Sequence, residues 1–352
     1  MVNVPPSVQR IAERLEQAGF ETWCVGGAVR DAFLGHAHLD WDLATAATPA
    51  EVRRLFRRTV PVGVDFGTVG VLDEAGVMHE VTTFRRDVHT NGRHAVVEFG
   101  ASLDDDLARR DFTINAIAVS PSTGEVRDPF GGQTDIDRRV IRAVGDPDER
   151  MREDRLRALR AIRFAARLGF EIDDATWEAI GRSAPHLGRL SRERVKQEIE
   201  KTMEQVRCPS RAFALWRDSG ALAALVPPLA RQSALPFASA DHVPLPGATR
   251  RAERAHARRA QRIVSLFLDL PAGDVRGALE GLRFSNVDVR TMTRLAEMWG
   301  TLFRPLSAAV SAPMPPTDAT IRGWAAAAGR TQLAPFLRLA AARWSATRDA
   351  GL

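Results

Sequence analysis

The pattern of hydrophobic and polar residues changes along this chain, and the change falls near residue 145. Residues 7–19 predict a short amphipathic helix, whose apolar face carries Val8, Ile11, Leu15 and Ala18. Runs typical of strands and broken by turns follow at 22–26, 39–43, 68–72, 77–84, 95–99 and 113–120. Further helices are expected near Val29 and from Thr48-Pro49, because Thr is a good N-cap and Pro suits the first helical turn. The first part of the chain therefore reads as an α/β unit.

From Asp146 onward the pattern is almost entirely helical and rich in Ala, Leu and Arg. One helix is expected from Arg152 to Gly169. Two stretches rich in Pro, Ser and Ala, at 226–249 and 306–317, predict loops or linkers between helical units. We therefore divide the chain into a head, a helical neck, and a helical body and tail, over residues 1–145, 146–205 and 206–352.

Composition narrows the class of protein. The 352 residues are 45% hydrophobic and 26% charged, as in an ordinary globular protein with ample core. The net charge of +5 suits a polyanionic partner modestly, although a GC-rich genome explains the preference for Arg over Lys at least as well. Cys24 and Cys208 are isolated, which indicates a reducing compartment and no structural zinc. Without a leader-like N-terminus or an apolar run of roughly 18 residues, we expect a cytoplasmic protein with no membrane span.

A Gly-Gly turn precedes two carboxylates near the start of the chain. The apolar run 23–25 ends at Gly26 and Gly27, which allow backbone N–H groups to approach a phosphate. Asp40 and Asp42 are two residues apart, so in an extended segment both point to the same side and can bind one cation. Carboxylate and phosphate oxygens are ligands that Mg²⁺ prefers. Each pattern alone also fits a simple turn or a solvated loop, but together they favour a metal-dependent nucleotidyltransferase.

Two later segments combine acids with arginines. Residues 104–116 place three acids and two arginines ahead of a β-branched run, a pattern that alone also fits a charged loop entering a strand. In the helix expected after Arg152, basic residues recur every three positions, at Arg157, Arg160 and Arg163. This spacing alone also fits a solvated helix face.

Asp154 and Arg157 present complementary hydrogen-bonding groups. A carboxylate accepts from the exocyclic amine of cytosine or adenine, and a guanidinium donates to the ring acceptors of these bases. Uracil and guanine present an N–H where the Arg would donate and a carbonyl where the Asp would accept. The pair therefore predicts selection of C and A by the protein alone, and an ion pair within the helix is the alternative.

Taken together, these motifs resemble those of the tRNA nucleotidyltransferase and bacterial poly(A) polymerase family. Residues 26–49 are similar to its GGxVRD and DxDxxT signatures, residues 106–116 to DLxRRDFTINA, and residues 153–157 to the EDxxR motif of CCA-adding enzymes. The similarity covers about residues 20–205. It implies an α+β fold: a nucleotidyltransferase head with a five-stranded mixed β-sheet, followed by an all-α neck, body and tail.

The resemblance also implies roles for individual residues. Asp40 and Asp42 would hold two Mg²⁺ ions, and Glu80 is a candidate third carboxylate, with a plain surface acid as the alternative. Asp111 would lie near the ribose of the nucleotide. Asp154 and Arg157 would read the base, with Glu153 steadying the Arg. The triphosphate would be held by Gly26, Gly27, Arg30, Arg110, Arg160 and Arg163.

The activity implied is addition of CCA to the 3′ end of tRNA from CTP and ATP, with release of pyrophosphate. Residues 61–69 resemble the CCA-adding form more than the poly(A) polymerase form. The polar segment 86–94 occupies the place of the family's flexible loop, but its departures from the usual pattern keep an enzyme that adds only A as an alternative. A non-catalytic RNA-binding protein is disfavoured, because such a protein gains nothing from carboxylates that face a phosphate. The expected partners are tRNA, CTP and ATP, and no obligate protein partner is inferred.

Overall fold

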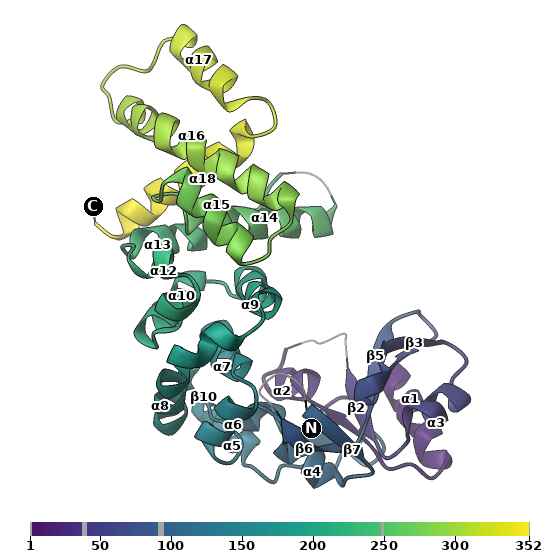
Figure 1. The fold of residues 1–352 in the computed structure, drawn as a ribbon. Coiled ribbons are helices and arrows are strands. Elements are labelled where there is room, and N and C mark those ends of the chain that lie inside the picture. The colour runs from purple at the N-terminus through teal and green to yellow at the C-terminus, as the bar shows by residue number, and fades with distance from the viewer. Residues whose placement is uncertain (1, 37–40, 91–94, 248–249, 352) are drawn as a thin grey trace. The chain divides into compact units, whose positions relative to one another are not determined.

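The fold comes from a computed structural model, and Figure 1 traces it from the N-terminus to the C-terminus. The structure describes all residues except 1, 37–40, 91–94, 248–249 and 352. By their internal contacts the residues form two compact units, Met1–Arg157 with Phe170–Ile180, and Ala158–Gly169 with Gly181–Leu352. Residues 146–157 therefore group with the head. Across the described ranges, no helix combines the length and the apolar character needed to cross a membrane.

The first unit is built on a mixed β-sheet, which confirms the predicted α+β class. Over the described residues its strand order is β3-β4-β5-β2-β1-β8-β9, with β2 and β5 parallel and the other neighbours antiparallel. The strands are β1 Thr22–Val25, β2 Asp42–Thr45, β3 Thr59–Gly63, β4 Thr68–Leu72, β5 Met78–Thr83, β8 Ala118–Val119 and β9 Val126–Arg127.

The prediction of five strands is wrong, because the described sheet has seven. The sequence predicts neither β3 nor β9. β3 is an edge strand that contains Pro61 and is largely exposed, so it lacks the alternation of a half-buried strand. β9 has only two residues, both exposed.

Helices cover both faces of this sheet. On one side, α1 (Pro6–Gln17) and α3 (Pro49–Leu55) contact β1, β4 and β5, and α2 (Gly27–Phe33) follows β1 directly (Figure 1). α4 (Leu103–Ala108) contributes to the core on the other side, which includes Val25, Ala44, Phe84, Leu103, Leu107, Ala116, Ala118 and Val144. The predicted N-cap Thr48 is confirmed, since its hydroxyl accepts from the Glu51 N–H in a capping box.

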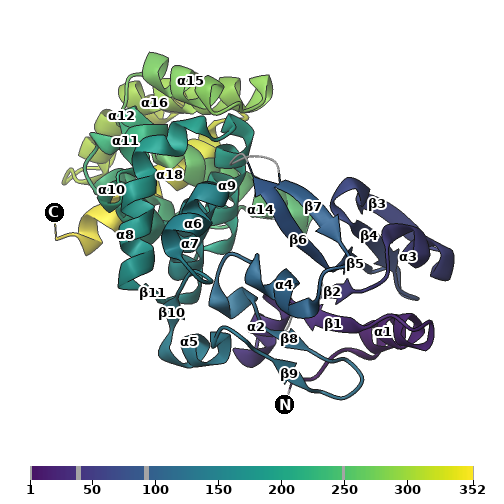
Figure 2. The same ribbon diagram turned by 60° about the horizontal axis from the view of Figure 1, so that its bottom comes forward.

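A two-stranded ribbon leaves the sheet after β5. It pairs β6 (Arg85–Thr90) with β7 (Ala95–Phe99) in an antiparallel arrangement (Figure 2). The strand expected at 95–99 is confirmed, but the loop expected at 86–94 is wrong over residues 86–90, which belong to β6 and pair with β7 except at an irregularity between Asp87 and His89. Backbone pairing with a hydrophobic strand overrides the polar composition of this segment, since strand formation depends strongly on cross-strand neighbours. Residues 91–94 lie outside the described residues.

The strand expected at 113–120 is largely wrong. Residues Thr113–Asn115 form a 3₁₀ turn, η2, and only Ala118–Val119 are a strand. Side-chain hydrogen bonds stabilise the turn: the Asn115 amide donates to Asp111, and the Thr113 hydroxyl donates to Asp135 of α5 (Gly132–Arg138). Such local bonds compete with strand pairing even where β-branched residues favour a strand.

The helix expected from Arg152 to Gly169 is two helices. α6 (Pro147–Glu153) ends at Asp154, whose backbone is extended with φ −146° and ψ 103°, and α7 (Leu156–Leu168) begins after it. An oxygen of the Asp154 carboxylate accepts the Leu156 N–H at 3.1 Å, so this residue ends one helix and caps the next. β10 (Val140–Ile141) and β11 (Glu171–Ile172) form a small parallel pair in the first unit.

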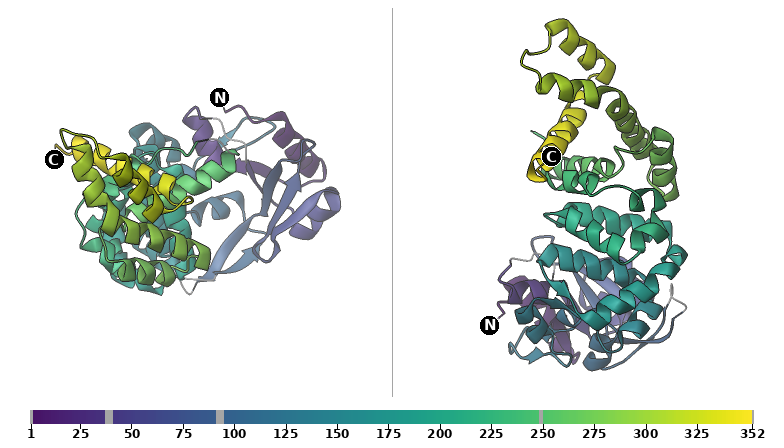
Figure 3. Two further views of the ribbon diagram at one scale, coloured as in Figure 1. Left: turned by 90° about the horizontal axis from the view of Figure 1, so that it is seen from above. Right: turned by 90° about the vertical axis from the view of Figure 1, so that its left-hand side faces the viewer.

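The second unit is helical and is drawn in teal to yellow in Figure 3. It contains most of α7 and the 3₁₀ turn η3 (Ala184–Arg189), and it shares α8 with the first unit. The helices from α8 onward are α8 Asp174–Ser183, α9 Arg192–Gln205, α10 Pro209–Asp218, α11 Ala221–Leu225, α12 Pro227–Ala230, α13 Leu235–Asp241, α14 Arg251–Ser265, α15 Ala272–Gly281, α16 Asn286–Val310, α17 Asp318–Ala328 and α18 Leu333–Asp349. The loop expected at 226–249 is wrong over α12 and α13, because the prolines there occupy first helical turns. The loop expected at 306–317 begins only after Val310.

We expect Gly132→Ala to destabilise the first unit, because a Cβ at this position would lie 2.2 Å from the Thr113 backbone oxygen. Forcing the first turn of α5 away from η2 should cost about 1–3 kcal/mol. The matched control is Gly181→Ala in α8, where a Cβ meets nothing within 4 Å; Ala should stabilise that helix by about 0.5–1 kcal/mol. Thermal unfolding followed by circular dichroism measures both, and equal midpoints for the two variants would contradict the tight packing of η2 on α5.

Candidate functional site

The Gly-Gly turn brings together residues from three distant segments. β1 ends at Val25, Gly26 adopts φ +79° and ψ −140°, and α2 begins at Gly27. A Cβ on Gly26 would lie 3.2 Å from Nη1 of Arg110 and 3.5 Å from Oδ2 of Asp42. The positive φ favours glycine, and the close approach of Arg110 leaves little room for a Cβ. The predicted phosphate-binding turn, one predicted metal carboxylate and one predicted triphosphate ligand therefore meet at one point.

Asp42 begins β2, half-buried and opposite Val25 of β1. On its other side, β2 pairs in parallel with β5, where Leu43 is opposite Val81. Continuing this register by one residue places Asp42 beside Glu80, so both carboxylates belong to the same face of the sheet. Oxygen donors of this kind fit Mg²⁺. Asp40 lies outside the described residues, and within the described ones no group of three or more His, Cys, Asp or Glu forms a metal cluster.

The thiol of Cys24 lies on the opposite face of β1. It is buried, and its burial, reinforced by the charge of Asp42, raises the pKa of the Cys24 thiol. The residue is therefore a core hydrophobe rather than a reactive group.

Asp106 of α4 holds the two adjacent arginines of the second motif. Its carboxylate is 1% exposed and accepts from Arg109 at 2.6 Å and from Arg110 at 3.0 Å. Burial works to raise the pKa of Asp106, but the charges of Arg110 and Arg109 outweigh it and hold the pKa below its ordinary value. Asp106 thus holds Arg110, a predicted triphosphate ligand, and the sequence analysis does not single it out. Its spacing of three and four residues from the arginines is the signal that identifies it.

Arg30 is buried, with 2% exposure, and its guanidinium is bound within the protein. Nε and Nη2 donate to Asp31 at 2.8 and 2.6 Å, and Nη1 donates to the Asn115 side-chain oxygen at 2.7 Å. The Asn115 amide in turn donates to Asp111 at 3.0 Å. Arg30 therefore reaches Asp111 through Asn115. This placement favours a role in positioning over the predicted direct contact with a triphosphate, even though Gly27 lies next to its guanidinium.

The residues predicted to read the base lie at the junction of α6 and α7. The Arg157 side chain is 11% exposed and is paired with Glu153, as the predicted supporting role of Glu153 requires. Its guanidinium also donates to the backbone oxygens of Arg150, at 3.0 Å, and of Arg109, at 2.9 Å. The second of these bonds ties Arg157 to the residue that precedes Arg110.

Arg150 is a second residue that the sequence analysis does not single out. It donates to the Ala108 backbone oxygen at 3.0 Å and pairs with Glu153 at 2.5 Å. Arg150 and Arg157 thus bind successive carbonyls at the C-terminal end of α4, where cations are favourable. No sequence signal identifies this contact, because the partner is a backbone atom about 40 residues away.

Arg160 and Arg163 belong to the helical unit. Arg160 lies over the Phe164 ring, with its guanidinium carbon 5.4 Å from the ring centroid. Arg163 is 4% exposed, donates to Glu198 at 2.7 Å, and so joins α7 to α9. Burial and this ion pair favour a structural role for Arg163 over the predicted triphosphate contact.

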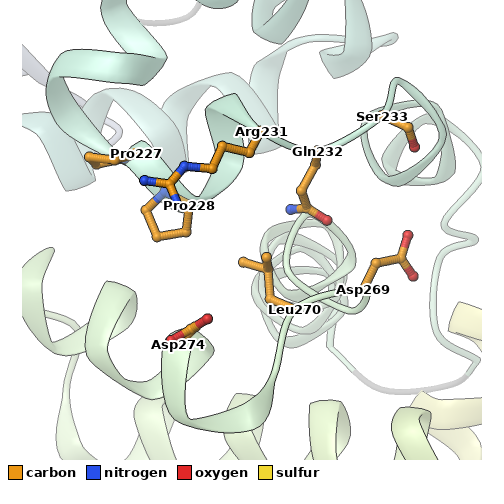
Figure 4. A pocket seen from close by; sticks show the side chains of 8 residues that line it. All are labelled: Pro227, Pro228, Arg231, Gln232, Ser233, Asp269, Leu270 and Asp274. Atoms are coloured by element: carbon orange, nitrogen blue, oxygen red, sulfur yellow. The ribbon is translucent and has the colours of Figure 1, made fainter.

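The helical unit also contains a polar cavity of about 450 Å³. Figure 4 shows its lining, which includes Arg231, Gln232, Asp269 and Asp274. Asp269 pairs with the buried Arg343 at 2.9 Å, so part of this lining serves helix packing. None of the predicted site residues lines this cavity.

The comparisons with known proteins agree with this arrangement. The family model for a poly(A) polymerase head domain matches residues 22–142, and the model for a probable RNA- and SrmB-binding site of polymerase A matches residues 169–232. The CCA-adding enzyme of Geobacillus kaustophilus is 45% identical over 254 residues, 71% of this chain and 62% of that protein. That of Leuconostoc mesenteroides is 49% identical over 197 residues, 55% of this chain and 49% of that protein. The chain thus spans about half to three fifths of these curated relatives.

Two solved structures are similar over nearly the whole chain. The Bacillus stearothermophilus CCA-adding enzyme in complex with CTP has a TM-score of 0.77 and 32% identity, and the match covers 98% of this chain and 82% of that one. The Thermotoga maritima CCA-adding enzyme complexed with tRNA shares the fold, with a TM-score of 0.71 at 19% identity over 99% of this chain and 84% of that one. The fold and the site thus define a nucleotidyltransferase head of the poly(A) polymerase type on a helical remainder. Within this class, the chain belongs to the family of CCA-adding enzymes.

We expect Arg163→Met to lower stability and to leave nucleotide affinity within a few-fold. Removing one partner of this buried ion pair leaves the Glu198 carboxylate with its longer contact to Lys201, at 3.8 Å, so the cost should reach at most about 3–5 kcal/mol. The control is Arg160→Met on the same helix, which leaves this ion pair intact. Thermal unfolding and calorimetric titration with CTP measure the two properties. A variant of Arg163 with unchanged stability but weakened CTP binding would instead support the triphosphate contact.

Proposed function

We propose that this protein adds CCA to the 3′ end of tRNA, without a nucleic-acid template, from CTP and ATP and with release of pyrophosphate. The observation that carries the proposal is the meeting of Gly26, Asp42 and Arg110 at one turn. The likeness to a CCA-adding enzyme solved with CTP supports it. The cytoplasm, where tRNA and both nucleotides are available, is the proposed location.

Magnesium is the proposed cofactor. Asp42, with Asp40 and Glu80, would hold it through carboxylate oxygens, the donors that Mg²⁺ prefers. When bound, the metal would neutralise phosphate charge and make the 3′ hydroxyl of tRNA a better nucleophile.

The protein's own groups would orient the nucleotide around this centre. The Gly26 turn presents backbone to the triphosphate and Arg110 adds a fixed positive charge, while Asp111 accepts from the ribose. The tRNA 3′ oxygen would then bond to the α-phosphorus as the bond to pyrophosphate breaks in line. Positioning of this kind supplies most of the rate enhancement in phosphoryl-group chemistry.

Asp154 and Arg157 would choose the base. Arg157 is oriented by Glu153 and attached to the segment that carries Arg110, so the base-reading group and the phosphate-contacting group share one framework. A carboxylate and a guanidinium in this arrangement match the Watson–Crick edges of C and A.

The first half of α14 is the surface we propose for tRNA phosphates in the helical unit. Arg250, Arg251 and Arg254 lie at its N-terminal end, with Glu253 as the acid among them. Cations at a helix N-terminus oppose the helix dipole, so this placement works against the stability of the helix. Phosphate binding gives these arginines a physical reason to be there.

The test of the proposed function is incubation with CTP, ATP and Mg²⁺ on three tRNAs, ending at the discriminator base, at C and at CC. Sequencing of the products should show CCA completed on all three. Addition to the tRNA ending in CC alone would identify an A-adding enzyme, and a run of A would identify a poly(A) polymerase. If no tRNA is extended, the proposed activity is wrong, and the alternative of a non-catalytic RNA-binding protein is favoured.

We expect Asp42→Asn to abolish nucleotide addition, because the amide removes a negatively charged metal ligand. Affinity for tRNA should stay within a few-fold of the unaltered protein, since no phosphate contact is lost. The control is Asp73→Asn, a carboxylate in the turn between β4 and β5, outside the strand that carries Asp42. Turnover and a tRNA gel-shift titration measure the two effects. Near-normal turnover of the Asp42 variant would remove the metal site from the proposal.

We expect Arg157→Ala to relax base choice more than it weakens nucleotide binding. Loss of one bidentate base contact should reduce discrimination against UTP and GTP by about 1–3 kcal/mol, roughly five- to 150-fold. The control is Arg152→Ala, which removes an exposed arginine of α6 and leaves Glu153 and its pair with Arg157 in place. Steady-state incorporation of all four nucleotides gives the comparison. An equal loss for all four would mean that Arg157 only supports the fold.

A further inference from the structure

The helical unit contains an apolar cavity that no step of the proposed reaction uses. It lies between α16, α17 and α18 and has a volume of about 260 Å³. Figure 1 shows α17 at the edge of this unit, next to α16. The residues that line the cavity are all apolar, and none is a predicted site residue; among them are Leu302, Leu306, Ile321, Trp324, Phe336 and Leu337. A water molecule would find few polar partners there.

The sequence of α17 explains why this space stays open. The cavity-facing positions of this helix recur at helical spacing, at Ile321, Trp324, Ala325 and Ala328. Two of the four are alanines, so methyl groups stand where a closely packed helix would carry larger side chains. Phe336 of α18, which also lines the cavity, is buried and packs edge-on against a neighbouring aromatic ring of α16. The cavity is therefore a gap beside a well-packed aromatic cluster.

Apolar surface continues beyond the cavity. Ile321 is 48% exposed and Leu337 is 44% exposed, although both also line the cavity. Met314, two residues before the lining Pro316, is 79% exposed. Large apolar side chains gathered at one place on a protein surface mark an interaction site. A small molecule confined to the cavity would leave these side chains in water, so the surface favours a larger partner that inserts a side chain.

The size of the cavity fits such an insertion. A cavity of about 150 Å³ already holds a benzene ring, so this one accepts an aromatic or branched aliphatic side chain. Drug-sized ligands generally occupy larger pockets, of about 300–1,000 Å³. One bulky side chain buried in a pocket at the centre of a contact is the usual anchor of a protein interface.

The charges around the cavity specify the partner further. Arg322 and Arg338 directly follow the lining residues Ile321 and Leu337, and Arg330 lies in the connection between α17 and α18. Between residues 302 and 341 the sequence contains one acid, Asp318. Among the residues that the structure describes, none forms an ion pair with these three arginines. An acidic partner would therefore be attracted. A second copy of this face would instead bring arginines against arginines.

We propose that the cavity between α16, α17 and α18, with the arginines beside it, binds an acidic amphipathic helix of another protein. Such a helix presents apolar side chains on one face, of which one enters the cavity and others cover the exposed apolar residues. Acids at the edges of that face would meet Arg322, Arg330 and Arg338. An RNA would meet the arginines through its phosphates and would leave the apolar cavity unfilled.

The test begins with a displayed library of random peptides of about 15 residues, a length at which an isolated helix is marginally stable. Selection on the full chain should enrich peptides that combine an apolar stripe at helical spacing with Asp or Glu. Binding of the strongest peptide is then measured by fluorescence polarisation. Ala325→Phe fills the cavity and should weaken binding at least about tenfold, the loss of one buried apolar anchor. The matched control is Ala326→Phe, the exposed next residue of α17, which should bind the peptide normally.

Charge variants test the second part of the proposal. Arg322→Glu and Arg338→Glu should each weaken the peptide about three- to tenfold, and the effect should shrink as salt is added. The control is Arg304→Glu, which makes the same change of charge on α16. Arg304 is two residues from both Leu302 and Leu306, so it projects from the other side of that helix and should not matter.

Circular dichroism checks that every variant is folded. If Ala325→Phe is not, Leu337→Glu places a charge at the partly exposed cavity wall and serves in its place. The proposal is overturned if no peptide is enriched, if the enriched peptides lack acids or an apolar stripe, or if Ala325→Phe and Ala326→Phe bind equally well. Single-stranded RNA and vesicles of anionic phospholipid are the comparison probes. If Ala325→Phe weakens binding of either probe while no peptide binds, the cavity serves RNA or a membrane instead.

Discussion

This site depends on one constraint. Several guanidinium groups must stay close together, against their mutual repulsion, when no polyanion is bound. Arg109 and Arg110 are adjacent, and the buried carboxylate of Asp106 binds both. Arg157 is held by Glu153 and by backbone oxygens. These internal partners offset the repulsion between the cations and reduce the freedom of each side chain. In the proposed function, a triphosphate would therefore meet arginines that are already oriented, which would lower the entropy lost on binding.

The same pairing joins the elements of the first unit. Arg157 connects the α6–α7 junction to the end of α4, and Asn115 connects η2 to α2 through Arg30. The Gly26 turn lies against Arg110 of the same set. The proposed base, ribose and phosphate contacts consequently belong to one hydrogen-bonded framework, in which displacement of one group is felt by its neighbours.

Features encoded by neighbouring residues could be predicted from the sequence. The Gly26 turn, the Thr48 N-cap and the helical character after Asp146 follow from local rules, and the structure has all three. The resemblance in the motifs predicted the family. The break at Asp154 escaped prediction, because the amphipathic pattern continues on both sides of it and only its capping bond to Leu156 reveals it.

Contacts between distant segments could not be predicted in the same way. Arg30 and its partner Asn115 are 85 residues apart in the sequence. The sequence therefore does not distinguish an arginine that is buried against such a partner from one that is free to contact a ligand. The same holds for Arg163. The spacing of arginines along α7 does not reveal that Arg163 pairs with Glu198 of α9. The prediction of a loop from the polar composition of residues 86–94 also failed at β6. There, backbone pairing with β7 decides the conformation.

The backbone oxygens bound by Arg157 have a consequence for how selectivity persists during evolution. If Arg157 reads the base as proposed, the carbonyls of Arg150 and Arg109 each accept one N–H of its guanidinium and hold its plane, while other N–H groups of the same guanidinium serve the base. A base with matching acceptors would satisfy those N–H groups, whereas a mismatched base would leave them buried and unpaired, at a cost of about 1–3 kcal/mol. Every amino acid supplies the same main-chain oxygen, so substitutions at positions 109 and 150 would leave this support in place. Rejection of the wrong base would thereby be partly insulated from sequence drift.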